Sequence, residues 1–211
     1  MRLRDKTFTM AVLDRNGISV AQTTAGAANL TITGVLATAS VATMDVPRHI
    51  GIYCAGDINT VVFTITGTDR TGKTITETIT GVNATTVNGA KNFATVTQIA
   101  TSAAVGTNVE VGTTNEAETA LYPLDYHAGE VSYSVELSAS ASLTWAAEYT
   151  LRNVLEPDFL EDDVSYFTDL SAQTANNANS TDGPVAAMRF AITAWTSASD
   201  IVTYAFNQRQ S

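Results

Sequence analysis

The chain is short of the residues from which catalytic and metal sites are most often built. It has one cysteine, Cys54, and two histidines among 211 residues. One cysteine excludes an internal disulfide framework and a cysteine-based zinc site, so Cys54 is expected as a small buried hydrophobe. Charged residues make up only 15% of the chain, so the surface has to be built largely from uncharged polar groups. No apolar run approaches the ~20 residues of a membrane-spanning helix, and the first residues show no secretory signal.

Positive charge is scarce as well. The net charge is −10, and from residue 119 onward there are three basic and twelve acidic residues. Binding of nucleic acid or of an anionic membrane surface needs a basic footprint, so neither is expected as a partner. The extreme N-terminus is the exception, because Arg2, Arg4 and Lys6 there outnumber Asp5.

What the sequence does have is alternation of apolar and polar residues. In the run 131–138 every odd position is apolar and every even position polar, which is the pattern of a strand with one buried and one solvated face. The same period recurs around Phe63, Trp145, Phe190 and Tyr204. Threonine is abundant in these runs, and its β-branched side chain suits the surface of a sheet. The only helix expected lies within Glu156–Asp163, one or two turns at most.

Turn signals between these runs predict an all-β chain of two β-sandwich, jelly-roll-like units with an N-terminal arm. Residues 1–28 form the expected arm, with a possible hairpin at Asn16-Gly17 and a stretch of small residues at its end. Residues 29–118 form the first sandwich unit, and residues 119–211 form the second.

One segment matches a well-known phosphate-binding pattern. The run from Gly67 to Thr74, GTDRTGKT, fits the P-loop motif. That mechanism requires a helix immediately after the loop, whose N-terminal amides hold the phosphates. Residues 75–80 are instead alternating β-branched residues, which predict a strand. We therefore interpret the run as a hairpin turn in which Gly72 adopts a positive φ.

Three other groups are weighed as sites. Asp125 and His127 share one face of an extended segment, with Glu130 nearby, but no companion nucleophile or second histidine accompanies them, and an exposed linker histidine is favoured. The acidic run 156–163 lacks the spacing of a calcium loop and is interpreted as a solvated loop. An aromatic platform for sugar rings is the third idea. Core packing is favoured for Trp145 and Tyr149, and Trp195 is expected to be freer; the four aromatic residues considered are Trp145, Tyr149, Trp195 and Tyr204.

Two stretches resemble small β proteins of tailed-bacteriophage virions. The first is VVFTITGTDRTGKTITETITG at residues 61–81, and the second is GPVAAMRFAITAWTSASDIVTYAFNQ at residues 183–208; residues 91–96 extend the first. The resemblance implies a virion structural protein, either a head-decoration (cement) protein or a tail or head–tail junction component. Such proteins carry no catalytic residues or cofactors.

The sequence thus predicts a non-enzymatic capsid decoration protein in the virion, assembled in the host cytoplasm. Its expected partners are the major capsid protein or other virion subunits, and it is expected to self-associate, as a trimer or as an array on a partner. A carbohydrate- or receptor-binding β-sandwich module is the alternative. The arm is expected to clamp a neighbouring subunit. The expected partner contacts are Arg2, Arg4, Lys6, Phe8, Met10 and Trp195.

Overall fold

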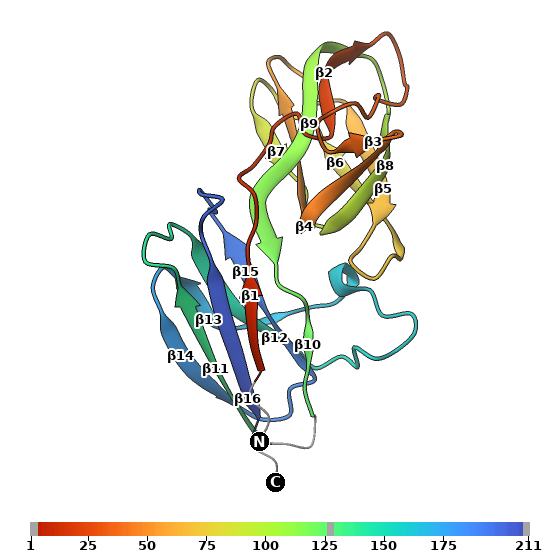
Figure 1. Ribbon diagram of the computed structural model, residues 1–211. Coiled ribbons are helices and arrows are strands. Elements are labelled where there is room, and N and C mark those ends of the chain that lie inside the picture. The colour runs from red at the N-terminus through yellow and green to blue at the C-terminus, as the bar shows by residue number, and fades with distance from the viewer. Residues whose placement is uncertain (1–3, 126–128, 209–211) are drawn as a thin grey trace. The chain divides into compact units, whose positions relative to one another are not determined.

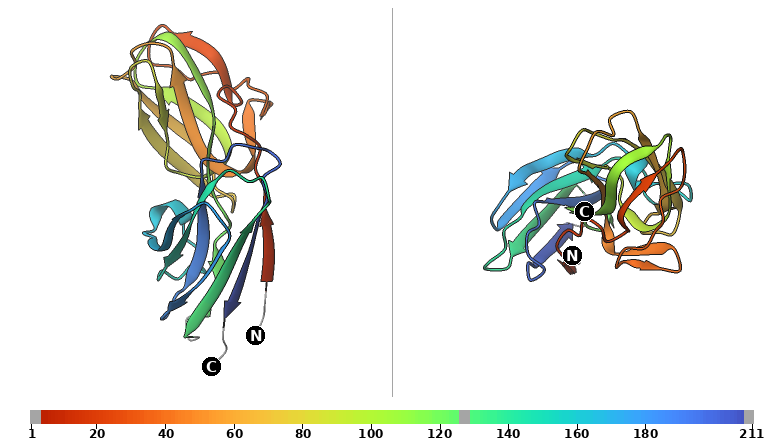
Figure 2. Two further views of the ribbon diagram at one scale, coloured as in Figure 1. Left: turned by 90° about the vertical axis from the view of Figure 1, so that its left-hand side faces the viewer. Right: turned by 90° about the horizontal axis from the view of Figure 1, so that it is seen from above.

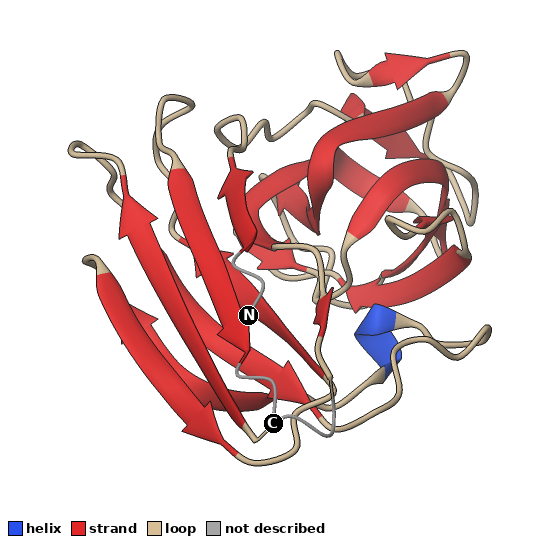
Figure 3. Cartoon of the chain, turned by 60° about the horizontal axis from the view of Figure 1, so that its bottom comes forward, coloured by secondary structure: helices blue, strands red, loops and turns tan. Residues whose placement is uncertain are grey.

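A computed structural model describes residues 4–125 and 129–208 of the chain. Over half of the chain lies in β-strands, and the described residues contain no α-helix. A 3₁₀ turn, η1 (Glu161–Asp163), lies in the segment where the sequence predicts one or two helical turns (Figure 3). The prediction of an all-β sandwich fold is therefore confirmed.

The chain divides into two compact units. One consists of residues 1–12 together with residues 118–211, and we call it the jelly-roll unit. The other consists of residues 13–117, and we call it the inserted unit, because its sequence interrupts that of the first. The inserted unit appears in red to green in Figure 1, and the jelly-roll unit in red at its start and in green to blue after residue 117.

The first sheet of the jelly-roll unit has four antiparallel strands in the order β1-β16-β11-β14. Register is regular, with Tyr133 of β11 opposite Phe206 of β16 and Asn179 of β14. The alternation predicted for residues 131–138 is present, since Val131, Tyr133 and Val135 are buried. The strands are β1 (Arg4–Phe8), β11 (Glu130–Leu137), β14 (Asn177–Asp182) and β16 (Val202–Gln208).

The second sheet of this unit runs β10-β15-β12-β13. Its strands are β10 (Tyr122–Pro123), β12 (Thr144–Thr150), β13 (Phe167–Gln173) and β15 (Ala187–Thr193). Numbered in chain order within the unit, the two sheets read 1-8-3-6 and 2-7-4-5. That order is the double Greek key of an eight-stranded jelly roll, and residues 13–117 are inserted between its first and second strands.

Aromatic packing between the two sheets forms the core of the jelly-roll unit. Phe190 is fully buried and contacts the rings of Tyr133, Trp145, Tyr204 and Phe206 at centroid distances of 5.1–5.8 Å. Offset and edge-to-face contacts of this kind add about 0.5–1.5 kcal/mol per pair beyond the burial of area. The alternating aromatic residues of four strands, β11, β12, β15 and β16, therefore act as one cluster.

The inserted unit is a further antiparallel sheet with a mainly aliphatic core. Its main path is β2-β9-β4-β8-β5-β6, and β3 and β7 pair with β4. Phe63, Ile65, Ile99 and Val111 are fully buried. The strands are β2 (Ser19–Thr24), β3 (Ala37–Thr38), β4 (Val41–Cys54), β5 (Val62–Thr68), β6 (Thr74–Thr80), β7 (Thr86–Asn88), β8 (Phe93–Thr101) and β9 (Val105–Glu118).

The N-terminal segment differs from the arm expected at residues 1–28. Strand β1 pairs with β16 over Arg4–Phe8, at the edge of the jelly-roll sheet (Figures 1 and 2). Residues 13–28 belong to the inserted unit, where Ile18 is fully buried and β2 pairs with β9. The segment shows no sustained alternation because it is split between two units, and the partners of β1 lie at the other end of the sequence.

Candidate functional site

A pocket of about 400 Å³ opens on the jelly-roll unit beside the end of β12. Six of its seven lining residues are apolar, and the seventh is Asn153. Concave, mainly apolar pockets of roughly 300–1,000 Å³ are the usual form of a small-molecule or cofactor site. The apolar lining comes from three separate stretches of chain, and consists of Pro123, Leu124, Leu151, Val154, Leu155 and Ala186.

Backbone hydrogen bonds hold these three stretches together. The N–H of Leu124 donates to the carbonyl of Ala186 (2.9 Å), and the N–H of Ala186 donates to the carbonyl of Thr150 (3.0 Å). The side chain of Asn153 accepts a hydrogen bond from the N–H of Leu155 (3.1 Å). Such an Asx turn fixes the backbone locally. The walls of the pocket are therefore formed before anything binds.

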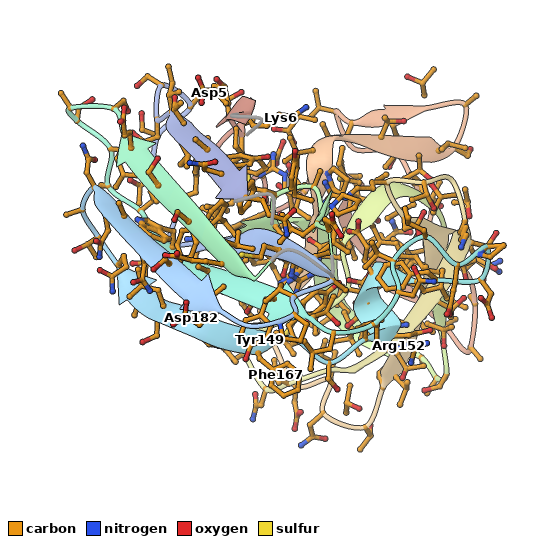
Figure 4. All side chains as sticks on the ribbon, turned by 90° about the horizontal axis from the view of Figure 1, so that it is seen from below. Asp5, Lys6, Tyr149, Arg152, Phe167 and Asp182 are labelled. Atoms are coloured by element: carbon orange, nitrogen blue, oxygen red, sulfur yellow. The ribbon has the colours of Figure 1, made fainter. Side chains whose placement is uncertain are left out.

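Two leucines of this pocket are unusually exposed. Leu151 is 53% exposed and Leu155 is 77% exposed. Phe167 is 49% exposed as well, and its ring stacks on that of Tyr149 at 5.5 Å (Figure 4). Single exposed apolar residues are ordinary, but apolar residues gathered around a concave surface mark sites of protein contact.

The segment 151–166, which supplies Leu151 and Leu155, is strongly acidic. It contains one basic residue, Arg152, and the five acidic residues Glu156, Asp158, Glu161, Asp162 and Asp163. Arg152, Glu156 and Asp158 are exposed. An apolar centre with a polar rim is the usual anatomy of a protein–protein interface.

A buried cation anchors the far end of this segment. The guanidinium carbon of Arg189 lies 3.5 Å from the centroid of the Tyr166 ring. Arg189 Nε donates to Glu148 (2.9 Å), and Glu118 lies 3.8 Å from the same guanidinium group. The two glutamates raise the pKa of Arg189 although burial opposes this. For Tyr166, by contrast, burial raises the pKa of the hydroxyl group. This hydroxyl donates a hydrogen bond to the carbonyl of Glu161.

A second concave surface lies on the four-stranded sheet. It is a shallow groove of about 530 Å³ over β11, β14 and β16, and none of its lining residues is charged. Alternation places Ser132 and Ser134 on the outer face, opposite the buried side of β11. The lining residues are Ser132, Tyr133, Ser134, Ala178, Asn179, Ser180, Ala205 and Asn207.

The partner-contact residues expected from the sequence do not form one exposed surface. Phe8 and Met10 are 8% and 2% exposed, and Trp195 is 1% exposed with its ring 5.8 Å from that of Phe8. The sequence predicts Trp195 to be the freer tryptophan, but the N-terminal strand brings Phe8 against it. Lys6 is exposed, Arg4 lies in β1, and Arg2 lies outside the described residues.

For the four aromatic residues weighed as a sugar platform, the core packing expected for Trp145 is present, whereas Tyr149 is more exposed and Trp195 more buried than expected. Trp145, Trp195 and Tyr204 are buried. Burial of Trp145 agrees with the core packing that the sequence predicts for it. Tyr149 alone of the four is partly exposed, and its neighbour in space is Phe167. Phe167 was missed because it stands in a strand whose alternation is weak.

The P-loop match is a β-hairpin, as predicted. Strands β5 and β6 pair in register from Val62 to Thr80, and Gly72 has a φ of +84°. One carboxylate oxygen of Asp69 accepts three hydrogen bonds, from the N–H and hydroxyl of Thr71 and from the N–H of Lys73. The loop amides are thus used within the turn.

The cysteine and the two histidines, His49 and His127, are spread over the chain. His49 Nδ1 lies 3.2 Å from Glu116, within the inserted unit. Cys54 is buried, as expected. His127 lies outside the described residues. Within the described part of the chain, no group of three or more His, Cys, Asp or Glu side chains is placed to hold a metal ion.

Comparison with models of known protein families finds none that matches this chain, and comparison with curated protein sequences finds no similar one. Among the described residues, no helix is long and apolar enough to cross a membrane. The fold and the two concave surfaces of the jelly-roll unit are therefore the basis for a functional proposal.

Proposed function

We propose that the protein is a non-enzymatic structural component of a tailed-bacteriophage virion, and specifically a capsid decoration protein that docks on a neighbouring protein through the apolar pocket. A component of the tail or of the head–tail junction is the nearest alternative within this class. Its partners are the major capsid protein or other virion subunits, and it acts in the particle after assembly in the host cytoplasm.

The observation that carries the proposal is the apolar pocket with its exposed leucines. Leaving Leu151 and Leu155 more than half exposed forgoes part of the roughly 1.5–3 kcal/mol that burying a leucine side chain is worth. A partner that covers both side chains recovers that free energy. The pre-formed walls of the pocket reduce the conformational entropy that binding costs.

Two further features support a virion component. Jelly rolls occur in viral capsid proteins and in lectins, so the strand order favours this class by analogy of fold. The resemblance of residues 61–81 and 183–208 to virion β proteins points the same way. Residues 61–81 contain the β5–β6 hairpin, and residues 183–208 contain β15 and β16.

The direct experiment is mass spectrometry of density-gradient-purified particles of the phage that encodes the chain. The proposal expects the protein at a fixed stoichiometry to the major capsid protein. Its presence only in the unassembled fraction would contradict the proposal. Light scattering on the purified protein tests the accompanying expectation of a trimer, or of an array formed only on the partner.

A carbohydrate-binding module is a second candidate, favoured by the uncharged groove over β11, β14 and β16. Ser132, Ser134 and Ser180 line it, and their hydroxyls suit a neutral, polyhydroxylated ligand. Native electrophoresis in gels containing dextran, xylan or mannan tests this. Retardation that Ser134→Lys abolishes, and that Thr203→Lys on the same face preserves, would support the second candidate over the first.

A further inference from the structure

Negative charge is concentrated in the jelly-roll unit. Residues 1–12 and 118–211 contain six basic and fourteen acidic residues, whereas residues 13–117 contain five basic and seven acidic residues. The unit that carries the apolar pocket thus has a net charge of −8, and the inserted unit has −2. Any partner approaching the pocket therefore meets a negative potential.

Exposed acidic residues also stand next to the pocket residues in the sequence. Glu156 directly follows Leu155 in the chain, and Asp158 is two residues further on; both are exposed. Asp125, also exposed, directly follows Leu124, which lines the same pocket. Arg152 is the single basic residue of the segment 151–166.

We propose that the apolar pocket receives an apolar side chain from a positively charged segment of a partner protein. The proposal rests on the docking role proposed above and names the chemistry of the partner. Leu151, Val154 and Leu155 provide the contact area, and Glu156, Asp158 and Asp125 select a basic segment and repel an acidic one.

The apolar residues and the carboxylates contribute differently to binding. Burial of the partner's apolar side chain supplies affinity, because it removes apolar surface from water. Salt does not screen this contribution. Exposed carboxylates contribute little affinity each, but they speed encounter and set the sign of the accepted partner. The Asx turn at Asn153 and the stacking of Arg189 on Tyr166 hold the segment that carries both functions.

The test uses the full chain with methyl-labelled leucine and three capped synthetic pentapeptides. The first peptide has a central leucine flanked by four lysines, the second has the same leucine flanked by four glutamates, and the third has a central glycine flanked by four lysines. Two-dimensional NMR then reports which leucine methyl groups shift. The proposal expects the lysine–leucine peptide to shift Leu124, Leu151 and Leu155 selectively and to bind at least about fivefold more tightly than either control peptide.

Variants separate the two contributions. Leu155→Ala is expected to weaken binding about fivefold, and Glu156→Gln combined with Asp158→Asn about threefold, with the loss larger at low salt. Two control variants are expected to leave binding unchanged. Ile201→Ala changes an exposed apolar residue, and Glu136→Gln changes an exposed acidic residue, both elsewhere in the same unit.

Equal binding of the lysine and glutamate peptides, or undiminished binding by the Leu155 variant, would overturn the proposal. So would the absence of any shift in the pocket leucines. These outcomes are separate from failure of the proposed function, because finding the protein in purified particles would preserve the virion role while the chemistry assigned to its partner failed.

Discussion

Arg189 lies over the ring of Tyr166, with its guanidinium carbon 3.5 Å from the ring centroid. Arg189 belongs to β15, in the sheet, and Tyr166 ends the segment that carries Leu151 and Leu155. The contact therefore joins the part of the chain with the exposed leucines to the rigid body of the jelly roll. Glu148 on the neighbouring strand β12 fixes the guanidinium group from the side.

Replacing Arg189 is expected to lower stability substantially. Arg189→Met leaves Glu118 and Glu148 without this cation in a largely buried place, which costs about 2–4 kcal/mol. Arg189→Lys keeps the charge but loses the planar stacking and the fork of donors, so it restores only part of the stability. Urea unfolding measures both variants. Arg152→Met, at an exposed site, is the control and is expected to change stability by no more than about 0.5 kcal/mol; an equally small effect of Arg189→Met would refute the anchoring role.

Stability is expected to fall in alkaline solution through two tyrosines, Tyr133, which is buried, and Tyr166, which is half-buried. Burial raises the pKa of Tyr166 and of Tyr133, and the hydrogen bond from Tyr133 to Asp169 (2.5 Å) raises the pKa of Tyr133 further. In the unfolded chain both tyrosines lose their protons near the ordinary pKa of 10.0. Above that pH the unfolded state binds fewer protons than the folded state, so the free energy of unfolding decreases as pH rises.

Urea midpoints between about pH 8 and pH 11 measure this dependence. The double variant Tyr133→Phe/Tyr166→Phe is expected to start from a lower stability but to lose less of it as pH rises. Identical slopes in the variant and in the natural protein would show that these tyrosines do not carry the alkaline sensitivity.

The hairpin at Asp69–Lys73 gives a prediction that separates turn chemistry from phosphate binding. Gly72→Val forces a β-branched residue to a φ of +84°, although a Cβ there would meet no other atom within 4 Å. The expected cost is about 1–2 kcal/mol from backbone strain alone. Asp69→Ala is expected to cost a similar amount, because three donors in the turn lose their acceptor.

Neither the natural protein nor the Lys73→Ala variant is expected to bind nucleotide. Isothermal titration with magnesium–ATP checks this, and thermal denaturation checks the two turn variants. Measurable ATP binding that disappears with Lys73→Ala would restore the P-loop interpretation.

The N-terminal strand is expected to be part of the fold. Phe8 is buried against Trp195, so Phe8→Ala should cost about 3 kcal/mol. Lys6→Ala, an exposed change on the same strand, should cost no more than about 0.5 kcal/mol. Thermal denaturation distinguishes the two. If the Phe8→Ala protein has the same melting temperature as the natural one, residues 4–8 are a passive arm and not part of the fold.

The strands and the tight turn could be predicted because their signals are local. Alternation around Tyr133 and Phe190 requires only neighbouring residues, and Gly72 marks its turn by itself. The insertion between β1 and β10 could not be predicted in this way, since the partner of Phe8 is Val202, far along the chain. The same long-range pairing buries Trp195. The pocket was missed because Leu151 and Leu155 stand in a loop without periodicity, where only the folded chain brings Ala186 beside them.

Incorporation of a pocket variant into particles tests the central claim most directly. Leu155→Asp places a charge at a side chain that is 77% exposed in the isolated protein, so folding and melting temperature should be unchanged. The account predicts that gradient-purified particles assembled with this variant lack the protein when measured by quantitative mass spectrometry. Particles with Ile201→Asp, a change at another exposed apolar residue, should retain it in full. Incorporation of the Leu155→Asp protein at the natural copy number would contradict docking through this pocket.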